Sequence, residues 1–227
     1  MNTSPICRTS FPDVINSTQA IGGTDRYWQA TIMLDKKNPE HMAWLKETAA
    51  EYNQCLANFY PDAAKRPRIP FTGHDKSPCK DGDTATNQQG IPIREKNPEY
   101  AGHYLLRFSA KDDGKPRRHF VIGSKMVNGA WVEIGSQTEI YGGCWGRVAG
   151  NFYQRKVASN PGVSIGLQGF QKVKDDESFG TPRIDPNEAF GALPGMNDPA
   201  NYESDPFATS AHQPPVQTDN PFGDMGF

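Results

Sequence analysis

One stretch of the chain alternates aromatic and guanidinium side chains with the period of a β-strand. Between residues 145 and 157, one face of such a strand carries Trp145, Arg147, Tyr153 and Arg155. Val148 and Phe152 fall on the opposite face, which is therefore the natural core side. Aromatic rings stack on nucleobases, and guanidinium groups pair with phosphates. The outer face thus has the chemistry of a surface for single-stranded nucleic acid, while a buried ring beside solvated arginines is the alternative.

Three further predicted strands repeat this placement of an aromatic side chain on the outer face. In the strand over 131–134, Val132 and Ile134 are expected to point inward. Across the three strands, the side chains expected on the outer face are Tyr27, Trp131, Phe170, Lys172 and Lys174. Four strands with the same pattern favour a nucleic-acid-binding face.

Basic residues surround the strands in the middle of the chain. Some of them lie in a turn over 111–118, which is either a solvated hairpin loop or a finger that grips phosphates. The candidate phosphate contacts in this region are Arg107, Lys111, Arg117, Arg118 and Lys125.

Other chemistries find little support. His74 and Cys79, with Cys55 nearby, could in principle hold zinc, but the chain has no CxxC or HxxxH spacing. It also has no GxSxG or Walker motif and no paired carboxylates in its ordered part, and Gly142 and Gly143 read as close-packing glycines. We therefore expect neither an enzyme nor a metal or other cofactor.

Charge divides the chain in two. Residues 175–227 hold ten acidic side chains and one basic side chain, a formal charge of −9, which leaves +7 on residues 1–174 because the whole chain carries −2. A basic body suits a polyanionic ligand. The four cysteines are widely spaced, as is usual for free thiols in a reducing compartment, and no apolar run is long enough to span a membrane. These features predict a soluble cytoplasmic protein.

The elements that must position these residues are mostly strands. Strands are predicted over 25–34, 100–111, 119–123, 131–134, 145–157 and 163–174. A helix should begin at the Asn38 cap, follow an apolar stripe from Met42 to Phe59 and end at Pro61. So many short strands are best closed into a barrel with one inserted helix and a long irregular insertion over 61–99.

Three parts follow from this pattern. Residues 1–23 are polar and read as a flexible N-terminal arm, and residues 24–174 form the barrel domain. Residues 175–227, with eight prolines and few aliphatic side chains, read as a disordered acidic tail.

A family resemblance rests on two glycine-rich runs, YGGCWGRVAGNFY at 141–153 and GVSIGLQGFQKVKD at 162–175. They resemble a family of phage single-stranded DNA-binding proteins, long filed as a domain of unknown function, in the version of a tailed phage of enterobacteria. The resemblance is tightest over 139–180 and looser over 25–138. It implies a five-stranded OB-fold that coats single strands without sequence preference.

The end of the chain resembles the tails of replication single-strand binders, in which acidic residues lead to an aromatic residue. The residues that match are Asp219, Phe222, Asp224 and Phe227. The likeness implies docking to replication or recombination proteins. A single-strand annealing or recombination-mediator protein, and an adaptor that acts only through its tail, remain alternatives; monomer and dimer both stay open.

Overall fold

The computed structural model describes residues 2–20, 22–155 and 161–180. Within these ranges the chain forms nine strands of one sheet, two α-helices and two short 3₁₀ turns. The strands and α-helices are β1 (Asn2–Thr3), β2 (Cys7–Gln19), β3 (Arg26–Asp35), α1 (Pro39–Phe59), β4 (Cys79–Asp81), α2 (Ile93–Lys96), β5 (His103–Asp112), β6 (Phe120–Val127), β7 (Ala130–Glu133), β8 (Trp145–Arg155) and β9 (Gly162–Lys174).

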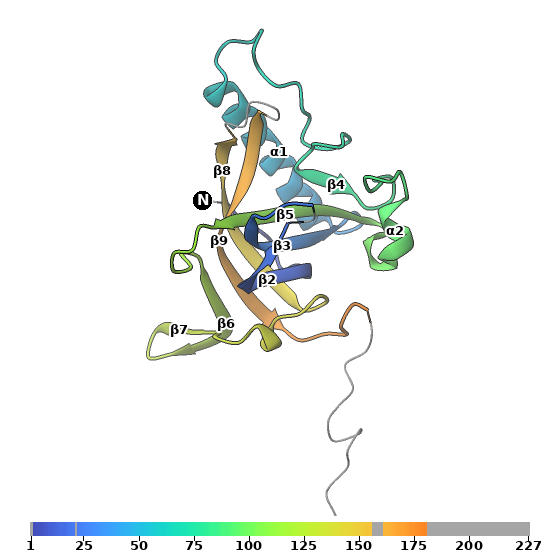
Figure 1. Cartoon of the computed structure of the whole chain (residues 1–227). Helices are drawn as coiled ribbons and strands as arrows, with labels where there is room; N and C mark the ends of the chain where they lie inside the picture. The colour runs from blue at the N-terminus through green and yellow to red at the C-terminus, as the bar shows by residue number, and fades with distance from the viewer. Residues whose placement is uncertain (1, 21, 156–160, 181–227) are drawn as a thin grey trace, which may run out of the picture. The chain divides into compact units, whose positions relative to one another are not determined.

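Five of the strands close into a barrel in the order β2, β3, β5, β9, β8 and back to β2 (Figure 1). All neighbours are antiparallel except β5 and β9, which pair in parallel. Closure removes the open sheet edges that so many short strands would otherwise expose. The predicted mainly β, OB-like barrel with one long inserted helix is thus confirmed. Its centre is filled by Val14, Ile32, Leu106, Phe108, Val148 and Phe170.

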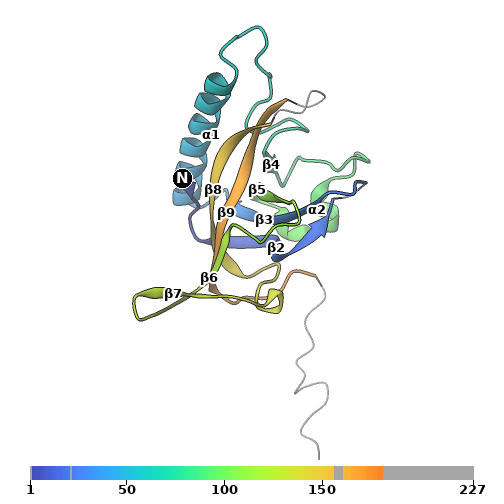
Figure 2. The ribbon, with the colours of Figure 1, turned by 60° about the vertical axis from the view of Figure 1, so that its left-hand side comes forward.

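The inserted helix α1 begins and ends where the sequence predicts. The Asn38 side chain accepts hydrogen bonds from the backbone N–H groups of Glu40 and His41, which caps the first turn. Leu45, Tyr52 and Leu56 of the apolar stripe are buried against the barrel. Figure 2 shows α1 lying along the side of the barrel, beside β8. In the part of the chain that the structure describes, neither α-helix combines the length and apolarity needed to cross a bilayer.

The expectation of a flexible arm over residues 1–23 is wrong. Residues of this segment form β2, a 13-residue strand that pairs with both β3 and β8 and completes the barrel. The strand is hard to recognise because Thr9, Ser10 and Ser17 are buried on it beside Cys7 and Val14, which interrupts an apolar pattern. Thr9 donates to the carbonyl oxygen of Cys144 at 3.1 Å, and the hydroxyl oxygens of Ser10 and Tyr100 are 2.8 Å apart. Hydrogen bonds to residues far along the chain therefore hold this strand in place, together with the buried side chains of Cys7 and Val14.

The long insertion is more ordered than its composition suggests. Its strand β4 pairs antiparallel with β5, and its Phe71 and Cys79 are buried. Lys36 reaches it from the body, with Nζ 2.5 Å from a carboxylate oxygen of Asp81 and 2.6 Å from one of Asp83. The insertion is therefore fixed beside β5.

Candidate nucleic-acid interface

A groove of about 560 Å³ lies on the outer face of the barrel. Strand register explains how residues distant in sequence meet there. Thr31 of β3 pairs with Arg107 of β5, and Ser164 of β9 pairs with Tyr153 of β8, so their side chains share one face. The structure brings four of the predicted site residues together in this groove: Tyr27, Arg107, Tyr153 and Arg155.

The groove combines open aromatic rings with positive charge. Tyr153 is 42 % exposed, and Arg155 donates from Nη1 to the Ser164 hydroxyl at 3.3 Å. Desolvation lowers the pKa of Arg107, the Asp13 carboxylate acts in the opposite direction, and the guanidinium keeps its proton at neutral pH. Among the described residues that line the groove, none is acidic. The arrangement can stack planar rings and pair with anions.

Two lysines of the insertion line the same groove and were missed in the sequence: Lys76 and Lys80. Lys80 pairs with Leu105 in the register of β4 and β5, and Leu105 precedes Arg107 by two residues on the same face. The Lys80 ammonium also donates to the backbone carbonyl oxygens of His74 and Asp75. The only sequence signal was the length of the insertion, since long loops in compact domains are usually functional or disordered.

A second hollow, of about 470 Å³, lies where the β6–β7 hairpin leaves the barrel. It brings together the predicted residues Trp131 and Arg147, and adds Phe120 and Ile122, which the sequence did not reveal. Figures 1 and 2 both show the hairpin extending away from the barrel. Val132, predicted to point inward, is therefore exposed, because this part of the hairpin has no core beneath it.

Phe170 is not on the outer face; the prediction is wrong. Its ring is fully buried, paired across the sheet with Val148. The pairing of β8 with β9 passes from Ala149 opposite Gly169 to Gly150 opposite Leu167, which leaves Gln168 as an extra residue. Such a β-bulge reverses the alternation of every residue beyond it.

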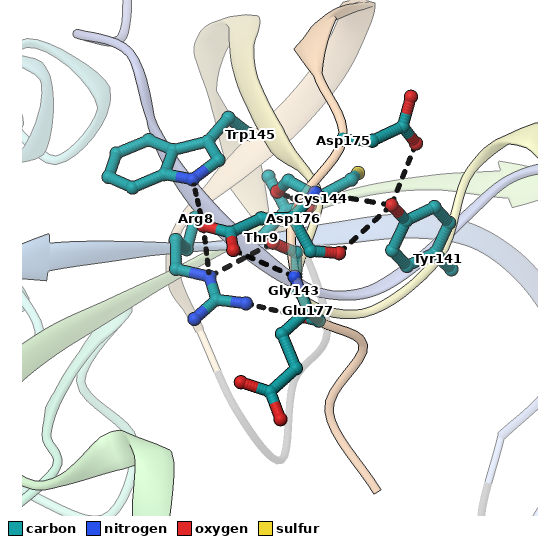
Figure 3. Close-up of polar contacts among 9 residues, drawn as sticks. All are labelled: Arg8, Thr9, Tyr141, Gly143, Cys144, Trp145, Asp175, Asp176 and Glu177. Carbon is teal, nitrogen blue, oxygen red and sulfur yellow. Dashed lines mark hydrogen bonds and ion pairs between the residues drawn. The ribbon is translucent and has the colours of Figure 1, made fainter. Parts of the chain in front are cut away.

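Two predicted contacts, Trp145 and Lys172, instead meet the first acidic residues after β9, and a third, Lys174, lies over the Trp145 ring. Figure 3 shows Trp145 beside Asp176. The indole N–H of Trp145 donates to Asp176 at 2.5 Å, and Lys172 Nζ lies 2.6 Å from a carboxylate oxygen of Asp175. Lys174 Nζ lies 4.7 Å from the centroid of the Trp145 ring. We call residues 175–179 the acidic clasp.

The acidic clasp is anchored to β2 and to the loop before β8. Arg8 donates from Nε to the carbonyl oxygen of Gly143 at 2.9 Å, and its guanidinium carbon lies 4.4 Å from the centroid of the Phe179 ring. Gly143 has a φ of +105°, and a Cβ there would stand 2.2 Å from the carbonyl oxygen of Glu177, so only glycine fits. Two hydrogen bonds lower the pKa of Asp176: the one from the Trp145 indole has the larger effect, and the one from the Glu177 N–H the smaller.

The prediction that the tail begins at residue 175 is wrong, because residues 175–179 contact the body: the Phe179 N–H, for example, donates to the carbonyl oxygen of Gly142 at 2.8 Å. The clasp's contacts need Arg8 and Tyr141, which are far away in sequence. The predicted partner-docking residues lie outside the described residues: Asp219, Phe222, Asp224 and Phe227.

The remaining four predicted phosphate contacts line neither the groove nor the hollow. Lys125 is exposed on β6. The other three are paired with carboxylates: Lys111 with Asp25 at 2.9 Å, Arg117 with Glu133 at 3.0 Å, and Arg118 with Asp113 at 3.5 Å. The turn over 111–118 is thus partly neutralised.

The cysteines are free thiols, as expected, and burial raises the pKa of Cys7 and of Cys79 to about 12. Within residues 2–20, 22–155 and 161–180, no three His, Cys, Asp or Glu side chains are grouped as metal ligands would be.

Comparison with known proteins places this geometry in a family. The family model of the ssDNA-binding protein of Enterobacter phage Enc34 matches residues 2–201. Among solved structures, the single-stranded DNA-binding protein from bacteriophage Enc34 in complex with ssDNA is 19 % identical, with a TM-score of 0.59 over 78 % of this chain and 88 % of that chain. A second structure of that phage protein is 20 % identical, with a TM-score of 0.54 over 83 % of this chain and 88 % of that one.

No curated protein sequence matches the chain. At such low identities the structural likeness establishes the fold, and the family match over residues 2–201 establishes kinship. The chain belongs to the family of the ssDNA-binding protein of Enterobacter phage Enc34.

Proposed function

We propose that the chain binds single-stranded DNA without sequence preference and that the strand lies in the groove. The observation that carries this proposal is the composition of the groove, which joins Tyr27 and Tyr153 to four cationic side chains without an acidic one among the described lining residues. Family membership supports the same ligand, because the family is named for its ssDNA-binding protein.

Binding would combine two physical effects. Bases stack on the exposed face of Tyr153 and on Tyr27, and each such contact stabilises the complex by about 1–3 kcal/mol whatever the base. Arg107, Arg155, Lys76 and Lys80 neutralise phosphates and release counterions. Neither effect reads base edges, which is why sequence preference should be weak.

The acidic tail would connect the bound strand to other proteins. Residues 181–227 carry a formal charge of −6, and the chain ends in Phe227. We propose that Asp219, Phe222, Asp224 and Phe227 dock on basic, apolar pockets of replication or recombination proteins in the cytoplasm of an infected cell. The protein would act by protecting and presenting single strands and not as an enzyme.

The proposal is tested by fluorescence anisotropy of a labelled oligo-dT, with a duplex and an RNA oligonucleotide of equal length as competitors. Affinity for the single strand should fall steeply with salt, with a slope of about 0.7 per phosphate neutralised. Equal affinities for oligo-dT, oligo-dC and oligo-dA within a few-fold would support sequence independence. Tighter binding of the duplex than of the single strand would contradict the proposal.

A further inference from the structure

The hollow beside the β6–β7 hairpin and the groove occupy opposite ends of one strand face. Arg147 and Ala149 of β8 line the hollow, and Tyr153 and Arg155 of the same face line the groove. Arg155 follows Arg147 by eight positions, a distance of about 26 Å along a strand. Between them the face carries two exposed polar side chains, Asn151 and Gln168. The Gln168 amide donates to the side-chain oxygen of Asn151 at 3.0 Å.

Two aromatic rings border the hollow. Phe120 lies against Gly169, where a Cβ would stand only 2.1 Å from the ring, so the absence of a side chain lets the ring rest on the backbone. Phe120 is 45 % exposed and Trp131 is 43 % exposed. Large rings left open to water beside a concave surface are typical of sites that receive a planar or apolar ligand.

Arg147 is held in position at the same hollow. Its Nε donates to the side-chain oxygen of Gln171 at 2.6 Å, and the Gln171 amide nitrogen donates to the carbonyl oxygen of Gly123 at 3.1 Å. Gln171 is buried and uses both ends of its amide in these bonds. It therefore fixes the guanidinium at the hollow and ties it to the hairpin backbone.

We propose that the hollow is a second nucleotide subsite, in which a base stacks on Phe120 and Trp131 and a phosphate pairs with Arg147. Gln171 acts as the positioning residue for that arginine. This proposal rests on the proposed function, and it adds a path: one strand runs along the outer face of β8 and β9 from the groove to the hairpin. No acidic residue is found among the described residues that line the hollow.

The path makes the contribution of the hollow depend on oligonucleotide length. A dT ladder from about 4 to about 16 nucleotides covers the site sizes usual for one OB-fold. With Trp131→Ala or Phe120→Ala, the shortest oligonucleotides should bind as they do to the parent protein, while those long enough to span both sites should bind about 5- to 150-fold more weakly. Val127→Ala, at an exposed hairpin residue that does not line the hollow, is the matched control.

The role of Gln171 is tested by the salt dependence of binding to the longer oligonucleotides. Gln171→Leu and Arg147→Gln should each lower the salt slope by about 0.7, and the double variant should lower it no further, because both act on one phosphate contact. A residue needed only for folding would change thermal stability without changing this slope.

The outcomes separate the two proposals. If the parent protein fails to bind single strands, the proposed function fails. If it binds them, and the Trp131 and Phe120 variants match it at every length, the second subsite is overturned. It is equally overturned if Trp131→Ala changes only self-association, measured by light scattering at unchanged affinity per protomer, since the hairpin would then be a contact between copies.

Discussion

Two aromatic residues on the same face of β8 meet different surroundings. Tyr153 opens into the groove, where its ring is available to a planar ligand. Trp145 lies at the other end of the strand, with its N–H bound to Asp176 and Lys174 stacked on its ring. Two aromatic side chains on one strand face therefore differ in accessibility, because only the Trp145 end of β8 lies beside the acidic clasp.

At Tyr153, we expect truncation to weaken binding without altering its electrostatics. Tyr153→Ala should cost about 1–3 kcal/mol of binding free energy, because it removes one stacking platform. Arg155→Gln should instead lower the salt slope by about 0.7, because it removes one phosphate contact. Anisotropy titrations at several salt concentrations distinguish the two, and identical effects of both variants would contradict the assigned roles.

His119 should make the fold sensitive to mild acid. The ring is buried, its Nε2 lies 2.6 Å from the carbonyl oxygen of Val14, and desolvation lowers its pKa. The unfolded chain therefore binds a proton on this histidine more readily than the folded chain does, so stability should fall as the pH drops through about 6.5.

Denaturant unfolding at pH 7.5 and at pH 5.5 measures this loss. His119→Gln should be less stable than the parent at the higher pH but should lose less on acidification. An equal loss in both proteins would assign the acid sensitivity to other groups.

At the scale of elements, pairings between strands decide what each residue faces. The bulge at Gln168 places Phe170 in the core and Gly169 on the outer face, where Phe120 then covers it. Strand β4 uses the part of the β5 edge that β9 leaves free, since β9 bridges β5 only at Ser109. Because β4 pairs with β5, Lys76 and Lys80 of the insertion line the groove.

The insertion should therefore contribute to the electrostatics of binding. Lys76→Gln and Lys80→Gln should each lower the salt slope of single-strand binding by about 0.7. Lys65→Gln is the matched control, because Lys65 lies on the same insertion with a side chain 84 % exposed and does not line the groove. A salt slope unchanged in the Lys76 variant would remove the insertion from the binding surface, and thermal melting of the Lys80 variant checks that the loop still holds.

At the scale of the whole molecule, charge is divided between body and tail. With the acidic clasp counted as part of the body, residues 1–180 carry +4 and residues 181–227 carry −6. Opposite charges on one chain attract most strongly at low ionic strength, and tethering raises their effective concentration. The tail is therefore expected to compete with DNA for the basic body.

Removal of residues 181–227, with the clasp retained, should tighten binding of single strands at low salt. The advantage should shrink as salt is added, because screening weakens the competition. Anisotropy titrations of both proteins from low to high salt measure this convergence. Equal affinities at low salt would leave the tail with a docking role only.

Much of the fold could be predicted because its signals are local. The helix from Asn38 to Phe59 shows its apolar stripe and its cap within one segment, and β3, β5, β8 and β9 show their alternation directly. The alternation also placed Tyr153 and Arg155 on one face of β8, while their meeting with Tyr27 and Arg107 in the groove follows from the pairing of the strands. A period-2 pattern names the residues that share a face before their neighbours are known.

The sequence by itself therefore determined the barrel class, the helix and the separation of charge. Only the tertiary structure decided that Cys7–Gln19 is a strand and that Phe170 is buried. It also decided that Lys80 lines the groove, that Asp176 binds Trp145 and that Asp175 binds Lys172. Each of these depends on a partner far away along the chain, such as Cys144 for Thr9 or Leu105 for Lys80. Local periodicity carries no record of such pairings, because they are selected by the free energy of the assembled barrel.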